Sequence, residues 1–240
     1  HGGENVETAL RDSCNIFFYN CAKRLGITKM NEYASAFGLG QKTGVEIAES
    51  AGTLAGPEER EAAGGVWQSG DTIQAGIGQS DNLFTPLQLS NYCATVANGG
   101  TRYQLHLVQS LIDNSSGTVT ETQPKIEESL DLHKSTLTAV KSGMRLVATQ
   151  GAPSLIFNQL RTEVAAKTGT SQVFVNGVKK NNGFLITFAP YDNPEISVAS
   201  VVELAGSGTS TAEITSSIIK YWYQNNTDEK TNQKTGTLLN

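Results

Sequence analysis

The fold of this chain is decided by the stretch Val164-Ala165-Ala166-Lys167-Thr168-Gly169-Thr170-Ser171-Gln172-Val173-Phe174-Val175. Apolar residues at both of its ends are typical of a strand, and a glycine inside a strand marks a close approach to the backbone. Lys167 and Thr168 beside that glycine offer a positive charge and a hydroxyl to an anionic ligand. The pattern also fits an edge strand protected by a lysine, so the surrounding sequence must decide between the two.

Strands and helices around this stretch predict an α+β fold. After the predicted turn Asn176-Gly177, two more strands are expected at 184–189 and 196–203. Apolar residues at helical spacing predict helices over 4–37 with a break at Gly26, over 86–98 and 135–149, and over 211–224. Consecutive strands flanked by helices indicate an antiparallel sheet with helices packed on it.

The remaining segments are expected to be loops and short strands. Residues 38–70 are rich in glycine and predict an irregular segment, while 102–112 and 117–121 predict a strand pair with its turn at 113–117. The charged segment 125–134 predicts a solvated connector, and the polar tail from Asn225 predicts a frayed end. We therefore expect one domain over 1–224, with a helical part at about 4–150, a sheet and closing helix at about 164–224, and a tail over 225–240.

Composition and charge exclude several classes of protein. The net charge of -5 argues against a nucleic-acid-binding surface, which needs clustered lysine and arginine. The chain contains no signal peptide and no run approaching 18 apolar residues, so it shows no membrane span. Cys14, Cys21 and Cys93 lack the spacing of a disulfide framework or a zinc site.

Five short motifs in one order resemble the transpeptidase domain of the penicillin-binding proteins, and the class B, high-molecular-weight type most of all. These motifs are Ser13-Cys14-Asn15, Gly76-Ile77-Gly78-Gln79, Thr85-Pro86-Leu87-Gln88-Leu89, Gly143-Met144 and Lys167-Thr168-Gly169-Thr170-Ser171. The resemblance extends from about residue 10 to residue 222. It implies the fold shared by serine β-lactamases and penicillin-binding proteins.

The family carries three catalytic motifs, Ser-x-x-Lys, Ser-x-Asn and Lys-Thr/Ser-Gly. By resemblance, Ser13 relays protons, Asn15 binds the substrate amide and Lys167 supports the relay electrostatically. Thr168 and Thr170 bind the substrate carboxylate. The backbone N–H of Thr170, just after Gly169, joins the oxyanion hole.

Two of these motifs occur more than once, so their positions need a choice. Lys-Thr-Gly is found at 42–44, 167–169 and 234–236, and the middle copy alone begins an apolar strand followed by two more. Ser-x-Asn occurs at 13–15 and again at 80–82. The second copy lies inside the Gly-Gln to Thr-Pro-Leu-Gln segment, a separate landmark in the family, so we prefer Ser13 and Asn15.

The nucleophilic serine is not found where the family has it. Ser217 and Lys220 form the chain's sole Ser-x-x-Lys pair, but the family places this motif before Ser-x-Asn. We interpret the pair as the polar flank of the closing helix. The resemblance then implies an incomplete domain that lacks the nucleophile helix and the N-terminal strands. Its last strand would expose an apolar edge that pairs with the missing N-terminal part or with a second copy.

The resemblance implies the C-terminal part of a peptidoglycan D,D-transpeptidase that acts on D-Ala-D-Ala stem peptides and binds β-lactam antibiotics. It needs no cofactor and no metal, and it works at the extracytoplasmic face of the cell membrane. This chain alone is expected to be inactive. The alternatives are a serine β-lactamase and a non-catalytic β-lactam sensor or scaffold.

Overall fold

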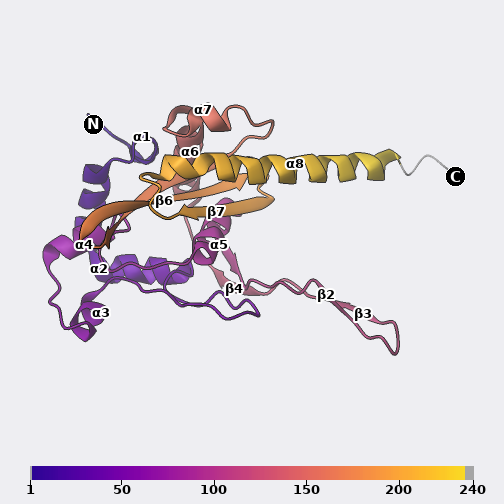
Figure 1. Cartoon of the computed structure of the whole chain (residues 1–240), viewed down its shortest axis with the longest axis horizontal. Helices are drawn as coiled ribbons and strands as arrows, with labels where there is room; N and C mark the ends of the chain where they lie inside the picture. Colours follow the sequence, from indigo (N-terminus) through magenta and orange to yellow (C-terminus); the bar gives the residue numbers. More distant parts are fainter. Residues whose placement is uncertain (1, 236–240) are drawn as a thin grey trace.

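A three-stranded antiparallel sheet forms the centre of the molecule, a computed structural model that describes residues 2–235 and the side chains of residues 2–226 (Figure 1). The strands are β5 (Ala165–Val175), β6 (Val178–Ala189) and β7 (Ile196–Val202), in the order β5-β6-β7. The predicted turn between the first two is confirmed. Asn176 and Gly177 both have positive φ, 52° and 76°, as a tight two-residue hairpin turn requires.

Helices cover both faces of this sheet, which confirms the predicted α+β class. Figure 1 shows α8 (Ala212–Thr235) along one face and α5 (Pro86–Ala97) against the other. Under α8, Leu185 and Val198 pack with Ile219 and with Phe157 of α7 (Ser154–Phe157). On the opposite face Phe188 packs with Cys93 and Val96 of α5 and Met144 of α6 (Lys134–Gln150). The predicted helix over 135–149 and the Thr85 cap with Pro86 at the first turn are confirmed.

The N-terminal region contains two helices. They are α1 (Val6–Arg11) and α2 (Asn15–Ala36), and α2 is interrupted at Gly26 (φ 74°, ψ 163°), as the sequence predicts. A second break separates α1 from α2 at residues 12–14. A side-chain cap at the start of the second helix is the ordinary companion of such a break. The residue before α2 is instead Cys14, which makes no side-chain capping bond, and Ser13 has φ 50°.

Two predictions about the irregular segments were wrong. Segment 38–70 contains α3 (Pro57–Ala62) and the start of α4 (Ser69–Ala75). Pro57 at the first helical position, followed by two glutamates, starts α3, but the helix is too short to show apolar periodicity. The predicted connector 125–134 contains β4 (Ile126–Ser129), which pairs with β1 (Thr101–Tyr103). All four β4 residues are exposed, so the alternation that normally indicates a strand is missing.

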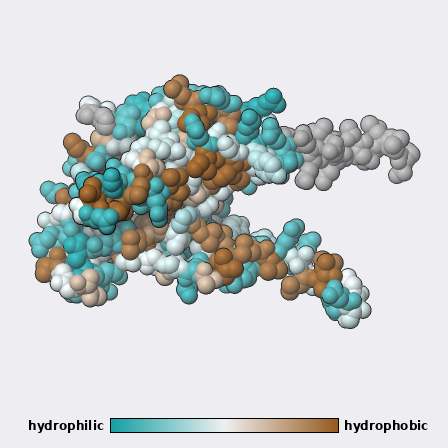
Figure 2. Space-filling model, in the orientation of Figure 1, coloured by the Kyte–Doolittle hydropathy of each residue, from teal (hydrophilic) through white to brown (hydrophobic). Residues whose placement is uncertain are grey.

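A hairpin projects from the body within the predicted strand pair. The predicted strand 102–112 is instead two short strands, because residues 104–109 between β1 and the hairpin form no strand. The hairpin consists of β2 (Ser110–Ile112) and β3 (Val119–Glu121), joined by the predicted turn. Figures 1 and 2 show it extending away from the sheet with hydrophobic residues on its surface. Leu111, Ile112 and Val119 are each more than half exposed. It contributes no residue to the cleft described below.

The C-terminal helix is longer than predicted. A 3₁₀ turn, Gly208–Thr211 (η1), leads into α8, which continues to Thr235, where the sequence predicted fraying from Asn225. No glycine or proline interrupts residues 212–235, so nothing in the sequence stops the helix. The third Lys-Thr-Gly copy, 234–236, lies outside the residues whose side chains are described. Among the described residues no helix is long and apolar enough to cross a membrane.

Candidate functional site

The decisive stretch is the edge strand β5, and it presents Lys167 to a cleft. Side chains alternate along a strand, so Lys167, Gly169 and Ser171 share one face with Phe184 and Ile186 of β6. The predicted close approach to the backbone at Gly169 is confirmed. Gly208 of η1 lies against it, and there is no room for a Cβ on Gly208.

Lys167 reaches out of the sheet to a serine from the other end of the chain. Its Nζ donates a hydrogen bond to Ser13 Oγ at 2.6 Å and a second to the carbonyl of Thr168 at 2.8 Å. Ser13 is exposed and lies in the break between α1 and α2. The structure therefore brings together two of the three predicted catalytic residues.

A close helix contact positions Ser13. Helix α1, which ends two residues before it, packs directly on α6. A Cβ on Gly143 of α6 would lie 2.7 Å from Leu10 Cδ1 and 3.1 Å from the backbone Cα of Glu7. Because only a glycine allows this approach, Gly143 sets the distance between α1 and α6, and with it the position of the Ser13 hydroxyl.

The surroundings of Lys167 destabilise its charged form. Burial lowers the pKa of its ammonium from 10.5 to about 8, because desolvation disfavours the charge. Among the described residues no carboxylate forms an ion pair with it. An amine with a pKa near 8, in contact with a hydroxyl, can exchange a proton with that hydroxyl near neutral pH.

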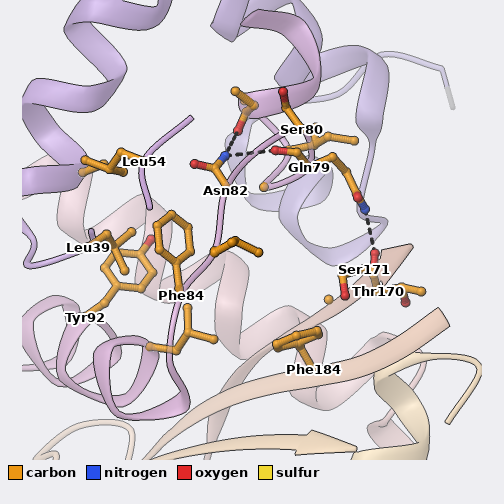
Figure 3. A pocket seen from close by; sticks show the side chains of 18 of the residues that line it. Leu39, Leu54, Gln79, Ser80, Asn82, Phe84, Tyr92, Thr170, Ser171 and Phe184 are labelled. Atoms are coloured by element: carbon orange, nitrogen blue, oxygen red, sulfur yellow. Dashed lines mark hydrogen bonds between the residues drawn. The ribbon is translucent and has the colours of Figure 1, made fainter. Parts of the chain in front are cut away.

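A cavity of about 590 Å³ opens beside Lys167 (Figure 3). One end is polar and is formed by β5 and the loop 78–82. The other end is apolar and is formed by α2, α5 and neighbouring loops. Figure 3 shows both ends, the apolar one with these labelled side chains: Leu39, Leu54, Phe84 and Tyr92. Phe184 lies on the sheet near Thr170 and Ser171. No aspartate or glutamate is among the described lining residues.

The loop 78–82 closes the polar end and joins it to β5. Gln79 Nε2 donates a hydrogen bond to the carbonyl of Thr170 at 2.8 Å (Figure 3). The sequence identifies Gln79 as part of the motif 76–79 and does not indicate this bond. Gly76 at the root of this loop lies against Ala22 of α2 with no room for a Cβ. Gly78 has open space around it and serves a positive φ of 79° instead.

The competing motif copies have structural contacts. Ser80 accepts a hydrogen bond from Arg60, and Asn82 Oδ1 accepts one from the backbone N–H of Ala55. In the first Lys-Thr-Gly copy, the hydroxyl of Thr43 is buried and bonded to Glu49. These contacts stabilise loops, although Ser80 and Asn82 both line the cavity. Ser13 is not among the described lining residues, and it is joined to the site by its bond to Lys167.

The structure does not bring the side chains of the other predicted site residues together with those of Lys167 and Ser13. Asn15 is the exposed first residue of α2 and does not line the cavity. Thr168 and Thr170 line it, but strand alternation places their side chains on the face opposite Lys167. The Thr170 hydroxyl accepts a bond from Gly208 N at 3.3 Å. Their roles remain predictions.

Two observations concern residues outside the predicted set. Ser171 lines the cavity on the same face as Lys167, and the alternation along β5 could have identified it. Ser217 and Lys220 are exposed on α8 and absent from the cavity lining. No cluster of histidine, cysteine, aspartate or glutamate suited to a metal ion exists in the described part of the chain.

Comparison with known proteins identifies similar sequences and structures. The model of the penicillin binding protein transpeptidase domain matches residues 1–220. The peptidoglycan D,D-transpeptidase MrdA of Escherichia coli K12 is 32% identical over 95% of this chain and 39% of its own length. Penicillin-binding protein 2A of Bacillus subtilis is 32% identical over 84% of this chain and 31% of its own length.

Solved structures agree with these relatives. Pseudomonas aeruginosa PBP2, in complex with WCK 5153, superimposes with a TM-score of 0.78 and 28% identity, over 90% of this chain and 48% of that one. Helicobacter pylori PBP2, in complex with MreC, gives 0.79 and 25%, over 93% and 41%. This chain thus spans less than half the length of each of these relatives.

Proposed function

This chain belongs to the penicillin-binding protein transpeptidase family, and from that membership we propose that it is the C-terminal part of a peptidoglycan D,D-transpeptidase. The parent protein would cross-link D-Ala-D-Ala stem peptides by serine acyl transfer and would be acylated by β-lactams. Its relatives named MrdA carry that activity in their names. The whole protein would act where peptidoglycan is assembled, at the extracytoplasmic face of the membrane.

The contact between Lys167 Nζ and Ser13 Oγ is the observation that carries this proposal. In acyl transfer the serine hydroxyl of the nucleophile must lose a proton, and the leaving amine must gain one. A hydroxyl bonded to a lysine of lowered pKa can pass that proton between the two. We assign this relay to Ser13 and Lys167, and we assign substrate binding to Asn15, Thr168, Gly169 and Thr170.

We further propose that the nucleophilic serine is supplied by polypeptide outside these 240 residues. Ser217 is the only serine here followed by lysine three residues later, and it lies on α8 without lining the cleft. Its hydroxyl donates to the carbonyl of Glu213 within the helix. The apolar end of the cavity that Lys167 lines has room for an additional apolar segment.

The strand β7 supports the same division of the protein. It pairs with β6 on one side, and its other edge has no strand partner among the described residues. An unpaired edge with apolar residues tends to recruit another strand. We propose that a further part of the parent protein, or a second copy of this chain, pairs there.

A serine β-lactamase is a weaker candidate. It needs a base to activate the water that hydrolyses the acyl-enzyme, and the described lining of the cavity contains no aspartate or glutamate. A non-catalytic β-lactam sensor would have the same residues as a transpeptidase at this site. The two are separated by turnover of a D-Ala-D-Ala donor in the complete protein.

Labelled penicillin tests the proposal directly. The 240-residue chain and the full-length gene product would each be incubated with fluorescent penicillin, and adducts would be located by mass spectrometry. We expect no adduct on this chain and a stable one on the full-length protein at a serine outside it. An adduct at Ser217 would refute the motif assignment, and rapid release of product would indicate a β-lactamase.

A further inference from the structure

Side chains occupy two of the outward carbonyls on the free edge of β5. Strand β5 pairs with β6 on one side only, and the Thr168 and Thr170 carbonyls accept bonds from Lys167 Nζ and Gln79 Nε2. In an antiparallel strand the N–H and C=O of one residue point the same way. The backbone N–H of Thr170 therefore faces the same open edge, beside the cavity.

The loop that carries Gln79 keeps its shape without this bond. Arg60 of α3 forms an ion pair with Asp81 at 2.5 Å, and it contacts Asp71 at 3.3 Å. Asn82 Nδ2 donates to the carbonyl of Gln79 at 3.1 Å, and its Oδ1 accepts from Ala55 N. Because these contacts hold the loop backbone, the Gln79 side chain can leave Thr170 while the loop stays in place.

We propose that Gln79 is a ligand-displaced gate on the β5 edge. Its primary amide occupies the carbonyl of Thr170, the acceptor that the amide N–H of an extended peptide needs in order to pair with this strand. The side chain would swing away when such a peptide binds and return when it leaves. The identification of that peptide as a stem peptide rests on the proposed function.

We expect the Gln79 side chain to compete with a bound peptide for the Thr170 carbonyl, and not to help the peptide bind. The bond between Gln79 and Thr170 is exposed to solvent, so it is weak and easily exchanged. A peptide backbone donates the same kind of N–H, and it must break the Gln79 bond before it can bind. Removing the side-chain amide should therefore strengthen peptide binding by about three- to tenfold, the equivalent of one ordinary hydrogen bond.

The experiment uses the 240-residue chain and two peptides that differ only in stereochemistry. One is an N-acylated peptide ending in D-Ala-D-Ala, and the other ends in L-Ala-L-Ala. Dissociation constants would be measured by NMR titration for wild type, Gln79→Ala and Gln79→Met. Gln159→Ala is the matched control, because Gln159 also bonds a backbone carbonyl but lies on the surface after α7. In wild type the Gln79 side-chain amide signals report whether the bond to Thr170 is released.

Each of the following four outcomes supports or overturns the gate. Tighter D-peptide binding in both Gln79 variants, with the Gln79 signals released at saturation in wild type, supports the gate and the proposed function. The same result with the L-peptide alone supports the gate and counts against the proposed function. Unchanged or weaker binding, or Gln79 signals that do not move, overturns the gate whatever the function. Binding of neither peptide to any variant also overturns it, because no peptide then pairs with this edge.

Discussion

Lys167 and Ser13 are 154 residues apart in the sequence, and their Nζ and Oγ atoms lie 2.6 Å apart in the structure. The strand β5 supplies the first residue, and the break between α1 and α2 supplies the second. Because the helices pack on the sheet through buried residues such as Met144 and Phe188, the contact is fixed by the core of the protein. The stability of the fold and the protonation of Lys167 can therefore be tested separately.

The first prediction concerns pH. The pKa of folded Lys167 is about 8, below its ordinary 10.5, so between these values the unfolded chain binds more protons than the folded chain. Stability therefore rises with pH over this window. Lys167→Met should be more stable than wild type at pH 7, by up to about 3 kcal/mol, and this advantage should shrink as the pH rises past 8. Urea unfolding of both proteins from pH 6.5 to 9.5 measures it.

The comparison with the variant matters because Cys93 and Tyr92 also titrate at high pH, with pKa values raised by burial. Their contributions cancel in the difference between wild type and Lys167→Met. Lys220→Met, on the exposed side of α8, is the control and should show no such dependence. Parallel stability curves for wild type and Lys167→Met would contradict the lowered pKa.

The second prediction concerns Gly143, which allows α1 to lie against α6. Gly143→Leu should push α1 away, lower the free energy of unfolding by about 1–3 kcal/mol and separate Ser13 from Lys167. Denaturant unfolding measures the first effect, and a change in the NMR signal of the Lys167 side chain reports the second. Gly70→Leu is the matched control, since a Cβ there meets nothing within 4 Å. Equal losses in both variants would show that the helix contact is not special.

The third prediction concerns Gln88, which holds the irregular segment before the cleft. Its side chain is 1% exposed and donates to the carbonyls of Gln41 and Ala51 at 2.6 and 2.7 Å. Gln88→Leu removes both donors and should cost about 2–4 kcal/mol of stability. Gln159→Leu removes an exposed bond and should change stability by less than about 0.5 kcal/mol. Urea unfolding distinguishes them, and similar losses would contradict the proposed anchoring role.

The sequence was sufficient for features that depend on local chemistry. Thr85 with Pro86 starts α5, Asn176-Gly177 forms the hairpin turn, and the Lys167 copy of Lys-Thr-Gly lies in the central sheet. Each depends on conformational preferences within a few residues, which a single sequence displays directly. The choice of Ser13 over Ser80 stays a prediction, with Ser13 bonded to Lys167 and Ser80 bonded to Arg60.

Features that depend on distant partners could not be predicted. The bond between Gln79 and Thr170 joins residues 91 positions apart, and no local sequence pattern predicts it. Strand β4 has no buried face and is held by its pairing with β1. The polar composition from Asn225 onward predicts fraying, but α8 extends to Thr235 because neither glycine nor proline interrupts the segment.

The last prediction concerns the free edge of β7. Because an unpaired strand with apolar residues recruits another strand, the 240-residue chain should self-associate as its concentration rises. Val201→Lys places a charge on this edge and should shift the equilibrium toward the monomer in sedimentation velocity. Val178→Lys, at the hairpin end of the same sheet and 54% exposed, is the matched control. If all three proteins stay monomeric at every concentration, a stable edge without a partner is the better description, and the proposed strand pairing fails.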